Sequence, residues 1–109
     1  MAAMTNAETI TDTEGQASGA QACVHRFGMD QPLQLDSGVK LAPVEIAYQT
    51  YGTLNDAGDN GILLCHGYTN TPHATGDENG WFKNLLGPGK AVDTDKYFVV
   101  CSNMLGSAY

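Results

Sequence analysis

The chain has 109 residues, of which 42% are apolar and 16% charged, and its five basic and twelve acidic side chains give a formal net charge of −7. Domains typically run to about 100–150 residues, so the chain can form one small domain with a modest core. Five scattered Lys and Arg residues cannot neutralise a run of phosphates, which argues against a nucleic-acid partner. The acidic balance equally disfavours an anionic membrane surface.

The sequence lacks the usual signals for membrane insertion or secretion. No apolar run approaches the roughly 20 residues of a transmembrane helix. Residues 1–22 contain no Lys or Arg and no apolar block, so they are unlike a secretory signal, and a cytoplasmic location is expected. Their polar, non-periodic composition predicts a disordered leader.

The cysteines and histidines do not form a recognisable metal or disulfide pattern. Cys23, Cys65 and Cys101 are odd in number and widely spaced, which favours reduced core residues over a disulfide framework. Cys65, His66 and His73 lack the paired short spacings of a structural zinc site. No metal site is therefore predicted.

The first structured part of the chain is predicted to be antiparallel. Residues 23–27 are a short strand candidate, and residues 32–41 are typical of a hairpin because Asp-Ser-Gly, a turn sequence, lies at their centre. Residues 44–50 alternate, which indicates a half-buried strand ended by Gly52. The positions expected to face the core are Val44, Ile46, Tyr48 and Thr50. The dense turn formers of residues 54–61 predict a surface loop.

The second part is predicted to be a parallel strand-helix-strand unit. Residues 62–65 are continuously apolar, which is typical of a strand buried on both faces of a parallel sheet. Apolar side chains at three- and four-residue spacing over residues 81–86 indicate a short amphipathic helix, ended by Gly87 and Pro88. A second apolar strand is expected over residues 97–101. Such crossover units are almost always right-handed.

These elements place the chain in the α/β class. Two buried parallel strands need neighbours on both sides and helices on both faces, yet the sequence offers one short helix. Residues 23–109 are therefore expected to be an incomplete, N-terminal part of an α/β sheet, antiparallel at first and then parallel. An exposed sheet edge is expected where later strands would pair.

A candidate site follows the apolar strand at residues 62–65, at the carboxyl end of the sheet, where ligands bind in open α/β sheets. In serine-dependent α/β-hydrolases, a His-Gly-x sequence at this place supplies one backbone N–H of the oxyanion hole. On this interpretation the Tyr68 N–H is the donor, Gly67 permits close approach, and His66 supports the loop by hydrogen bonding without being the catalytic base. The alternative is an ordinary tight turn, and the tripeptide alone leaves both interpretations open.

Other reactive side chains favour structural roles. His73 lies in a polar loop and is expected to be a partly exposed loop histidine. Burial in strands disfavours Cys65 and Cys101 as nucleophiles, since a reactive thiol needs a base beside it. Asp93 and Asp95 flank a turn, where bonds from the side chain to the backbone are the common use.

Four segments are specific enough to indicate relatives. They are PLQLDSG at residues 32–38, AYQTYGTLN at residues 47–55, GWF at residues 80–82 and GPGKAVDTDKYFVVCSN at residues 87–103. In sequence, order and spacing, the chain from about residue 27 onward resembles the N-terminal third of homoserine O-acetyltransferases. The resemblance implies an α/β-hydrolase core with a helical lid. It also implies a double displacement in which a serine takes acetyl from acetyl-CoA and passes it to homoserine, on the route to methionine.

The resemblance also implies what this chain lacks. The family's Ser, Asp and His triad lies beyond the equivalent of Tyr109, so only the oxyanion position carries over, onto Tyr68. The 109-residue chain alone is therefore expected to be inactive. The implied partners are small molecules, an acyl-CoA and a homoserine-like amino acid, with acetyl-CoA as cosubstrate and no bound cofactor. A homodimer built through the lid is implied for the full-length protein.

The sequence departs from the family's usual pattern near the candidate site. Biosynthetic enzymes usually have His-Ala-Leu-Thr-Gly where this chain has HGYTN at residues 66–70, and residues 104–109 also differ from the common ending. The oxyanion loop borders the acyl pocket, so Tyr68 in place of leucine could change the accepted substrate. Two alternatives stay open: a carboxylic-ester hydrolase of the same fold, in which water takes the acyl group, and an inactive truncated product.

Overall fold

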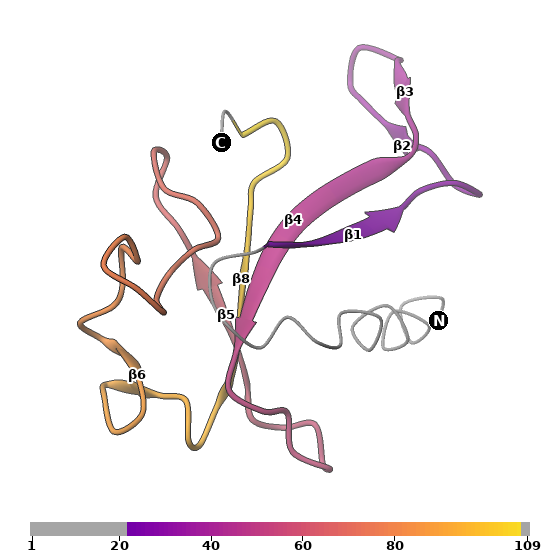
Figure 1. Ribbon diagram of the computed structural model, residues 1–109. Helices are drawn as coiled ribbons and strands as arrows, with labels where there is room; N and C mark the ends of the chain where they lie inside the picture. Colours follow the sequence, from indigo (N-terminus) through magenta and orange to yellow (C-terminus); the bar gives the residue numbers. More distant parts are fainter. Residues whose placement is uncertain (1–21, 108–109) are drawn as a thin grey trace.

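The computed structural model describes residues 22–107 (Figure 1). The predicted leader, apart from Ala22, lies outside the described residues. The strands are β1 (Cys23–Phe27), β2 (Leu33–Gln34), β3 (Lys40–Leu41), β4 (Val44–Tyr51), β5 (Gly61–Cys65), β6 (Leu86–Gly87), β7 (Val92–Asp93) and β8 (Phe98–Ser102).

The four longest strands form one sheet in the spatial order β1-β4-β8-β5. β1 is antiparallel to β4 and β4 is antiparallel to β8, whereas β8 and β5 are parallel. The prediction of antiparallel first strands followed by a parallel pair is confirmed. β8, the last strand of the described residues, thus lies inside the sheet, between β4 and β5.

Two smaller pairs accompany the sheet. β2 and β3 form the predicted hairpin, whose turn is closed by bonds from the Leu35 N–H to the Val39 carbonyl and from the Gly38 N–H to the Leu35 carbonyl, both 2.9 Å. In Figure 1 this hairpin projects from one end of the β1–β4 pair. β6 and β7 are a short parallel pair within the crossover from β5 to β8.

The predicted amphipathic helix over residues 81–86 is wrong. One backbone hydrogen bond in this segment, from the Leu86 N–H to the Phe82 carbonyl at 3.0 Å, has α-helical spacing, and the others that close its turns span three residues. Six residues gain few helical hydrogen bonds against the cost of nucleation, so tertiary packing decides the backbone conformation here. Leu86 instead enters β6 and pairs with Val92. Residues 22–107 contain no helix, so the crossover consists of loops, turns and the β6–β7 pair.

The crossover covers one face of the sheet and builds the main core there. The buried cluster joins Ala74 and Leu86 of the crossover to Val99 and Cys101 of β8, each of them 0% exposed. The side chains packed against this cluster are Tyr51, Ile62, Leu64, Trp81, Phe82 and Val92. Full burial of a side chain such as Leu86 contributes about 1.5–3 kcal/mol.

The opposite face is open along β5. Leu63 is 66% exposed and Cys65 is also exposed. The predictions that residues 62–65 are buried on both faces and that Cys65 is a core residue are therefore wrong. Successive side chains of a strand point to opposite faces, and the crossover covers only the face to which Ile62 and Leu64 point.

β4 is half-buried, but the predicted alternation fails at its end. Val44 and Tyr48 are buried as expected, whereas Thr50 is exposed and Gln49 is only 6% exposed. Gln49 is the register partner of Cys101, so its side chain lies on the crossover face. This buried glutamine brings β4 into contact with the loop that follows β5.

Candidate active-site loop

The loop after β5 begins with a buried histidine that joins two strand ends. His66 is 8% exposed, and its Nε2 lies 2.9 Å from Oδ1 of Asn103, the residue after β8. Its Nδ1 lies 2.8 Å from the Gly67 carbonyl. A carbonyl oxygen only accepts, so Nδ1 carries the proton in that bond. The Asn103 N–H in turn donates to the Ala47 carbonyl at 2.7 Å, which extends the connection to β4.

The next residues form a tight turn with an exposed tyrosine at its tip. The Asn70 N–H donates to the Gly67 carbonyl at 3.0 Å, and the Tyr68 residue is 88% exposed. Within residues 22–107, the Tyr68 N–H donates to no protein acceptor. The turn therefore leaves the Tyr68 N–H without a protein partner within the described residues, at the carboxyl end of the parallel pair.

The far end of the loop is held on β4 by Tyr51. Its hydroxyl oxygen accepts the Ala74 N–H at 2.8 Å and lies 3.0 Å from the Pro72 carbonyl and 2.6 Å from Oε1 of Gln49. Burial raises the pKa of the Tyr51 phenol above its usual value of 10.0, against the lowering effect of the Ala74 N–H. Tyr51 is thus a protonated hydroxyl at neutral pH, with one proton to donate.

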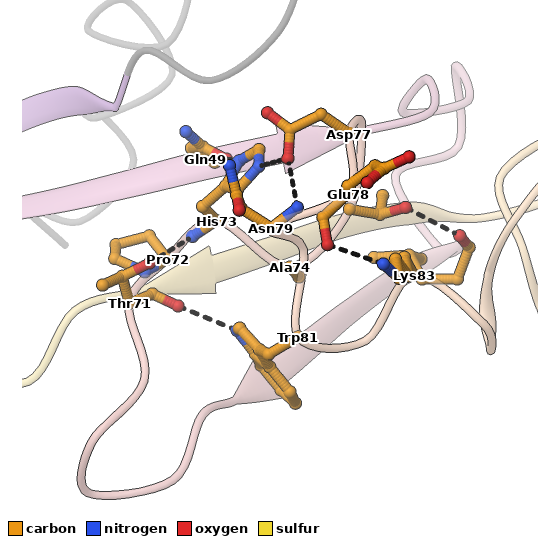
Figure 2. A network of polar contacts seen from close by, with 12 residues as sticks. Gln49, Thr71, Pro72, His73, Ala74, Asp77, Glu78, Asn79, Trp81 and Lys83 are labelled. Carbon is orange, nitrogen blue, oxygen red and sulfur yellow. Dashed lines mark hydrogen bonds and ion pairs between the residues drawn. The ribbon is translucent and has the colours of Figure 1, made fainter.

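His73 links the same loop to β4 and to its own next turn (Figure 2). Its Nδ1 lies 3.1 Å from Oε1 of Gln49, and its Nε2 lies 2.7 Å from Oδ1 of Asp77. The hydrogen bond from His73, followed by one from the Asn79 N–H, lowers the pKa of the Asp77 carboxyl below its usual value of 3.8. His73 is half-buried in a loop as expected, but its three-part network was not predicted.

A third connection joins the loop to the turns before β6. The Trp81 indole N–H donates to the Thr71 carbonyl at 2.9 Å, a bond drawn in Figure 2, and the Phe82 N–H donates to the Ala74 carbonyl at 2.8 Å. Segment 71–75 is therefore held by bonds to β4 and to residues 81–82. The turn at residues 67–70 lies between this segment and His66.

The remaining candidates have structural surroundings. Asp93 accepts the Gly89 N–H at 3.0 Å and the Asp95 N–H at 2.9 Å, which confirms its turn role, and these bonds lower the pKa of its carboxyl. Burial, with a smaller effect of Cys65, raises the pKa of the Cys101 thiol to about 11, so Cys101 is a poor nucleophile.

The described part of the chain offers neither a cluster of metal-ligating side chains nor a helix that could span a membrane. No three His, Cys, Asp or Glu side chains among residues 22–107 are grouped so that they could hold a metal ion. The same residues contain no helix of the length and apolarity needed to cross a membrane.

Sequence reasoning placed the loop but missed the residues that hold it. Gln49 and Tyr51 lie on β4 and reach residues 72–74 across more than twenty positions of sequence. The alternating pattern assigned Gln49 to the solvent face. The one usable signal was Gln49-Thr50-Tyr51 itself, two polar-tipped side chains two residues apart and so on one face of a strand.

Comparison with known proteins connects this architecture to enzymes. No family model matches the chain. The homoserine O-acetyltransferase of Mesorhizobium japonicum is 50% identical over 100 residues, which cover 86% of this chain and 25% of that protein. Among solved structures, homoserine O-acetyltransferase from Bacillus anthracis matches with a TM-score of 0.66 and 39% identity over 76% of this chain and 23% of that one. Esterase E22 matches with a TM-score of 0.68 and 32% identity over 80% of this chain and 24% of that one.

The four-stranded sheet and the loop after β5 are therefore the N-terminal part of an α/β-hydrolase sheet. The chain spans about a quarter of the length of the curated relatives it matches. Within the superfamily, it is the N-terminal portion of a homoserine O-acetyltransferase-like protein.

Proposed function

We propose that this chain is part of a serine-dependent O-acyltransferase that moves acetyl from acetyl-CoA to homoserine, in methionine biosynthesis. The observation that carries the proposal is the identity of about half of the aligned residues with homoserine O-acetyltransferases. The proposed partners are small molecules, an acyl-CoA and a homoserine-like amino acid. A cytoplasmic location and a homodimer of the full-length protein belong to the same proposal.

The proposed reaction has two displacements. A serine hydroxyl attacks the thioester carbonyl, and the tetrahedral intermediate expels the CoA thiolate. The homoserine hydroxyl then attacks the acyl-serine, and the second tetrahedral intermediate expels the serine oxygen, which takes up a proton as O-acetylhomoserine is formed. The nucleophile and its Asp and His partners are proposed to lie beyond Tyr109. The described residues would contribute the Tyr68 N–H, which donates to the oxyanion in both tetrahedral intermediates. Gly67 lets the backbone approach, and His66 holds the loop through Asn103.

The reaction is tested on the protein made from its complete reading frame. We expect acetyl-CoA and homoserine to yield O-acetylhomoserine and free CoA, measured by mass spectrometry and by thiol titration. The 109-residue chain alone should release no CoA. A reading frame without a G-x-S-x-G elbow after residue 109, or a protein that acetylates no hydroxyl amino acid, would refute the proposal.

A variant without the backbone N–H of residue 68 tests this group as an oxyanion donor. Tyr68→Pro lacks the backbone N–H, whereas Tyr68→Ala keeps it and loses only the exposed side chain. Loss of one oxyanion donor typically lowers kcat by about 100- to 1000-fold. We expect that loss in Tyr68→Pro and not in Tyr68→Ala, with thermal melting to show that both variants fold. Equal kcat in the two variants would exclude the Tyr68 N–H as a donor.

A carboxylic-ester hydrolase is the second candidate function. It is favoured by the structural match to esterase E22 and by an exposed tyrosine at the tip of the loop. In this case the acyl-serine is attacked by water, so CoA release from acetyl-CoA is independent of homoserine and p-nitrophenyl acetate is hydrolysed steadily. The assay with and without homoserine separates the two functions.

A further inference from the structure

Gln49, Tyr51 and His73 form a polar cluster beneath the loop, and the proposed reaction assigns none of them a role. Gln49 is 6% exposed and the His73 side chain 15% exposed, so their hydrogen bonds must be made largely within the protein. Oε1 of Gln49 lies within hydrogen-bond distance of both Tyr51 and His73, at 2.6 and 3.1 Å. Figure 2 shows His73 between Gln49 and Asp77.

A proton count reveals a conflict when the Gln49 oxygen faces this cluster. An amide oxygen only accepts, and the Tyr51 hydroxyl has one proton to donate. That proton is then required by both the Gln49 oxygen and the Pro72 carbonyl, although it can serve only one of them. His73 must also carry a proton on each nitrogen, because Nδ1 and Nε2 both face acceptor oxygens.

A half turn of the amide exchanges its oxygen and nitrogen and removes the conflict. The NH₂ group then donates one proton to the Tyr51 oxygen and the other to Nδ1 of a neutral His73. Tyr51 gives its own proton to Pro72 and still accepts the Ala74 N–H at 2.8 Å. His73 donates from Nε2 to Asp77. Every contact now pairs one donor with one acceptor.

We propose that Gln49 and His73 are positioning residues for the loop that carries Tyr68: the Gln49 amide donates to neutral, Nε2-protonated His73 and so reserves the Tyr51 proton for Pro72. A proton added at Nδ1 reverses the amide and withdraws the Tyr51 proton from the Pro72 carbonyl. The catalytic consequence rests on the proposed function, whereas the protonation pattern does not.

Of the groups that face His73, Gln49 is the one that contacts Nδ1. Asp77, from the same loop, contacts Nε2 and favours a proton on that nitrogen whether His73 is neutral or charged. From β4, the Gln49 amide contacts Nδ1, and Tyr51 lies beyond the amide. Cys101, the register partner of Gln49 on β8, is a buried thiol and carries no charge at neutral pH. Among these groups, only the amide contacts Nδ1 directly.

The position of Pro72 in the loop links the Tyr51 hydrogen bond to the Tyr68 N–H. Pro72 lies shortly after the turn that presents the Tyr68 N–H, and His66 holds the other end of that turn. An oxyanion donor must remain about 2.7–3.1 Å from the oxyanion. Loss of the bond between Tyr51 and Pro72 removes one of the bonds that hold segment 71–75, while those of Thr71 to Trp81 and of Ala74 to Phe82 remain, so the support of the donor is weakened.

The first experiment measures the histidine tautomer in the complete wild-type protein. Imidazole ¹⁵N labelling with long-range ¹H–¹⁵N NMR distinguishes the two nitrogens and shows which of them carries the proton. The measurement is made at about pH 8, where an ordinary histidine is neutral. His→Asn substitutions at residues 25, 66 and 73 assign the signals. We expect His73 to be protonated at Nε2 and unprotonated at Nδ1. An Nδ1-protonated or doubly protonated His73 would overturn the proposal.

The second experiment replaces the proposed donor with a group that can only accept. In Gln49→Glu, the carboxylate faces Nδ1, so we expect His73 to become doubly protonated under the same conditions while the His66 signal stays unchanged. Gln31→Glu places the same charge at an exposed position and should leave His73 as in the wild type. A His73 tautomer that is unaffected by Gln49→Glu would refute the role of the amide.

The third experiment reads the positioning role in catalysis. Displacement of a catalytic group by about 1 Å can lower the rate by about 100-fold. We expect Gln49→Glu to lower kcat for acetyl transfer by up to that factor with little change in KM, and Gln31→Glu to have no effect. An unchanged kcat in Gln49→Glu beside an altered tautomer would refute positioning. If the wild-type protein transfers no acyl group, the proposed function fails and the tautomer measurement still decides the hydrogen-bond assignment.

Discussion

Gly52, the residue after β4, gives the most direct test of the packing between the end of β4 and the turn before β8. Its backbone has a φ of +79°, in the left-handed region. A Cβ at this position would contact the Tyr97 carbonyl oxygen and would lie 2.8 Å from the Thr94 carbonyl oxygen. Both are backbone atoms of a turn closed by hydrogen bonds from Lys96 and Tyr97 to the Asp93 carbonyl, so they cannot move aside cheaply.

Gly58→Ala is the matched control for Gly52→Ala. Gly58 has a similar φ of +68°, but an added Cβ would meet nothing within 4 Å. Both variants carry the left-handed penalty of about 1–2 kcal/mol, offset by about 0.4–1 kcal/mol from the less flexible unfolded chain. Only Gly52→Ala adds overpacking, which typically costs about 1–3 kcal/mol. We therefore expect Gly52→Ala to be less stable than Gly58→Ala by about 1–3 kcal/mol.

Urea unfolding of the complete protein, followed by tryptophan fluorescence, measures this difference. The midpoint of Gly52→Ala should fall below that of Gly58→Ala by the difference in free energy of unfolding divided by the m value, which grows with the surface exposed on unfolding. Equal m values in the two variants would show that the unfolded states are comparable. Midpoints that agree within error would refute the reasoning, because the close approach of β4 to the turn at residues 93–97 would then be absent.

Three further predictions concern the core, the acid limit and thiol reactivity. Leu86→Ala should destabilise the protein by about 2–5 kcal/mol in the same unfolding assay, whereas Leu85→Ala, at a residue 47% exposed, should cost much less. The lowered pKa of Asp77 means that its contribution to stability is present above pH 3.8 and lost as the pH falls below that value. Asp77→Asn should therefore remove part of the acid sensitivity in a pH series of melting curves. The Cys101 thiol has a folded pKa of about 11 against a usual 9.0, so its contribution is complete below pH 9 and lost as the pH rises toward 11. At neutral pH, iodoacetamide and peptide mapping should find exposed Cys65 modified in the folded protein and Cys101 only after unfolding.

The strands of the sheet could be predicted because their signals are local. Alternation marked residues 44–48, a turn sequence marked the β2–β3 hairpin, and the apolar runs marked β5 and β8 within one residue. The segment at residues 81–86 failed because periodicity reports which side chains are buried and not which backbone buries them. Trp81, Phe82 and Leu86 do contact the core, but through turns and β6.

The sequence predicted where the candidate site lies, but not which residues hold its loop. The position of Tyr68 follows from a strand end and a glycine, both of which are visible in the sequence. Gln49 owes its contact with the loop residue His73 to the antiparallel pairing of β4 with β8, which determines the face on which the Gln49 side chain lies. Such information is tertiary, so a buried glutamine looked like a solvent-facing one.

The position of β8 at the centre of the sheet sets an order for folding during synthesis. His66 and its partner Asn103 lie 37 residues apart, so at about 5–20 residues per second the ribosome adds Asn103 roughly 2–7 s after His66. During that interval β1 and β4 can pair, but β5 has no neighbour and the candidate loop has no support from β8. The nascent chain therefore exposes the apolar side chains of β5 for seconds, a period in which chaperone binding would compete with aggregation.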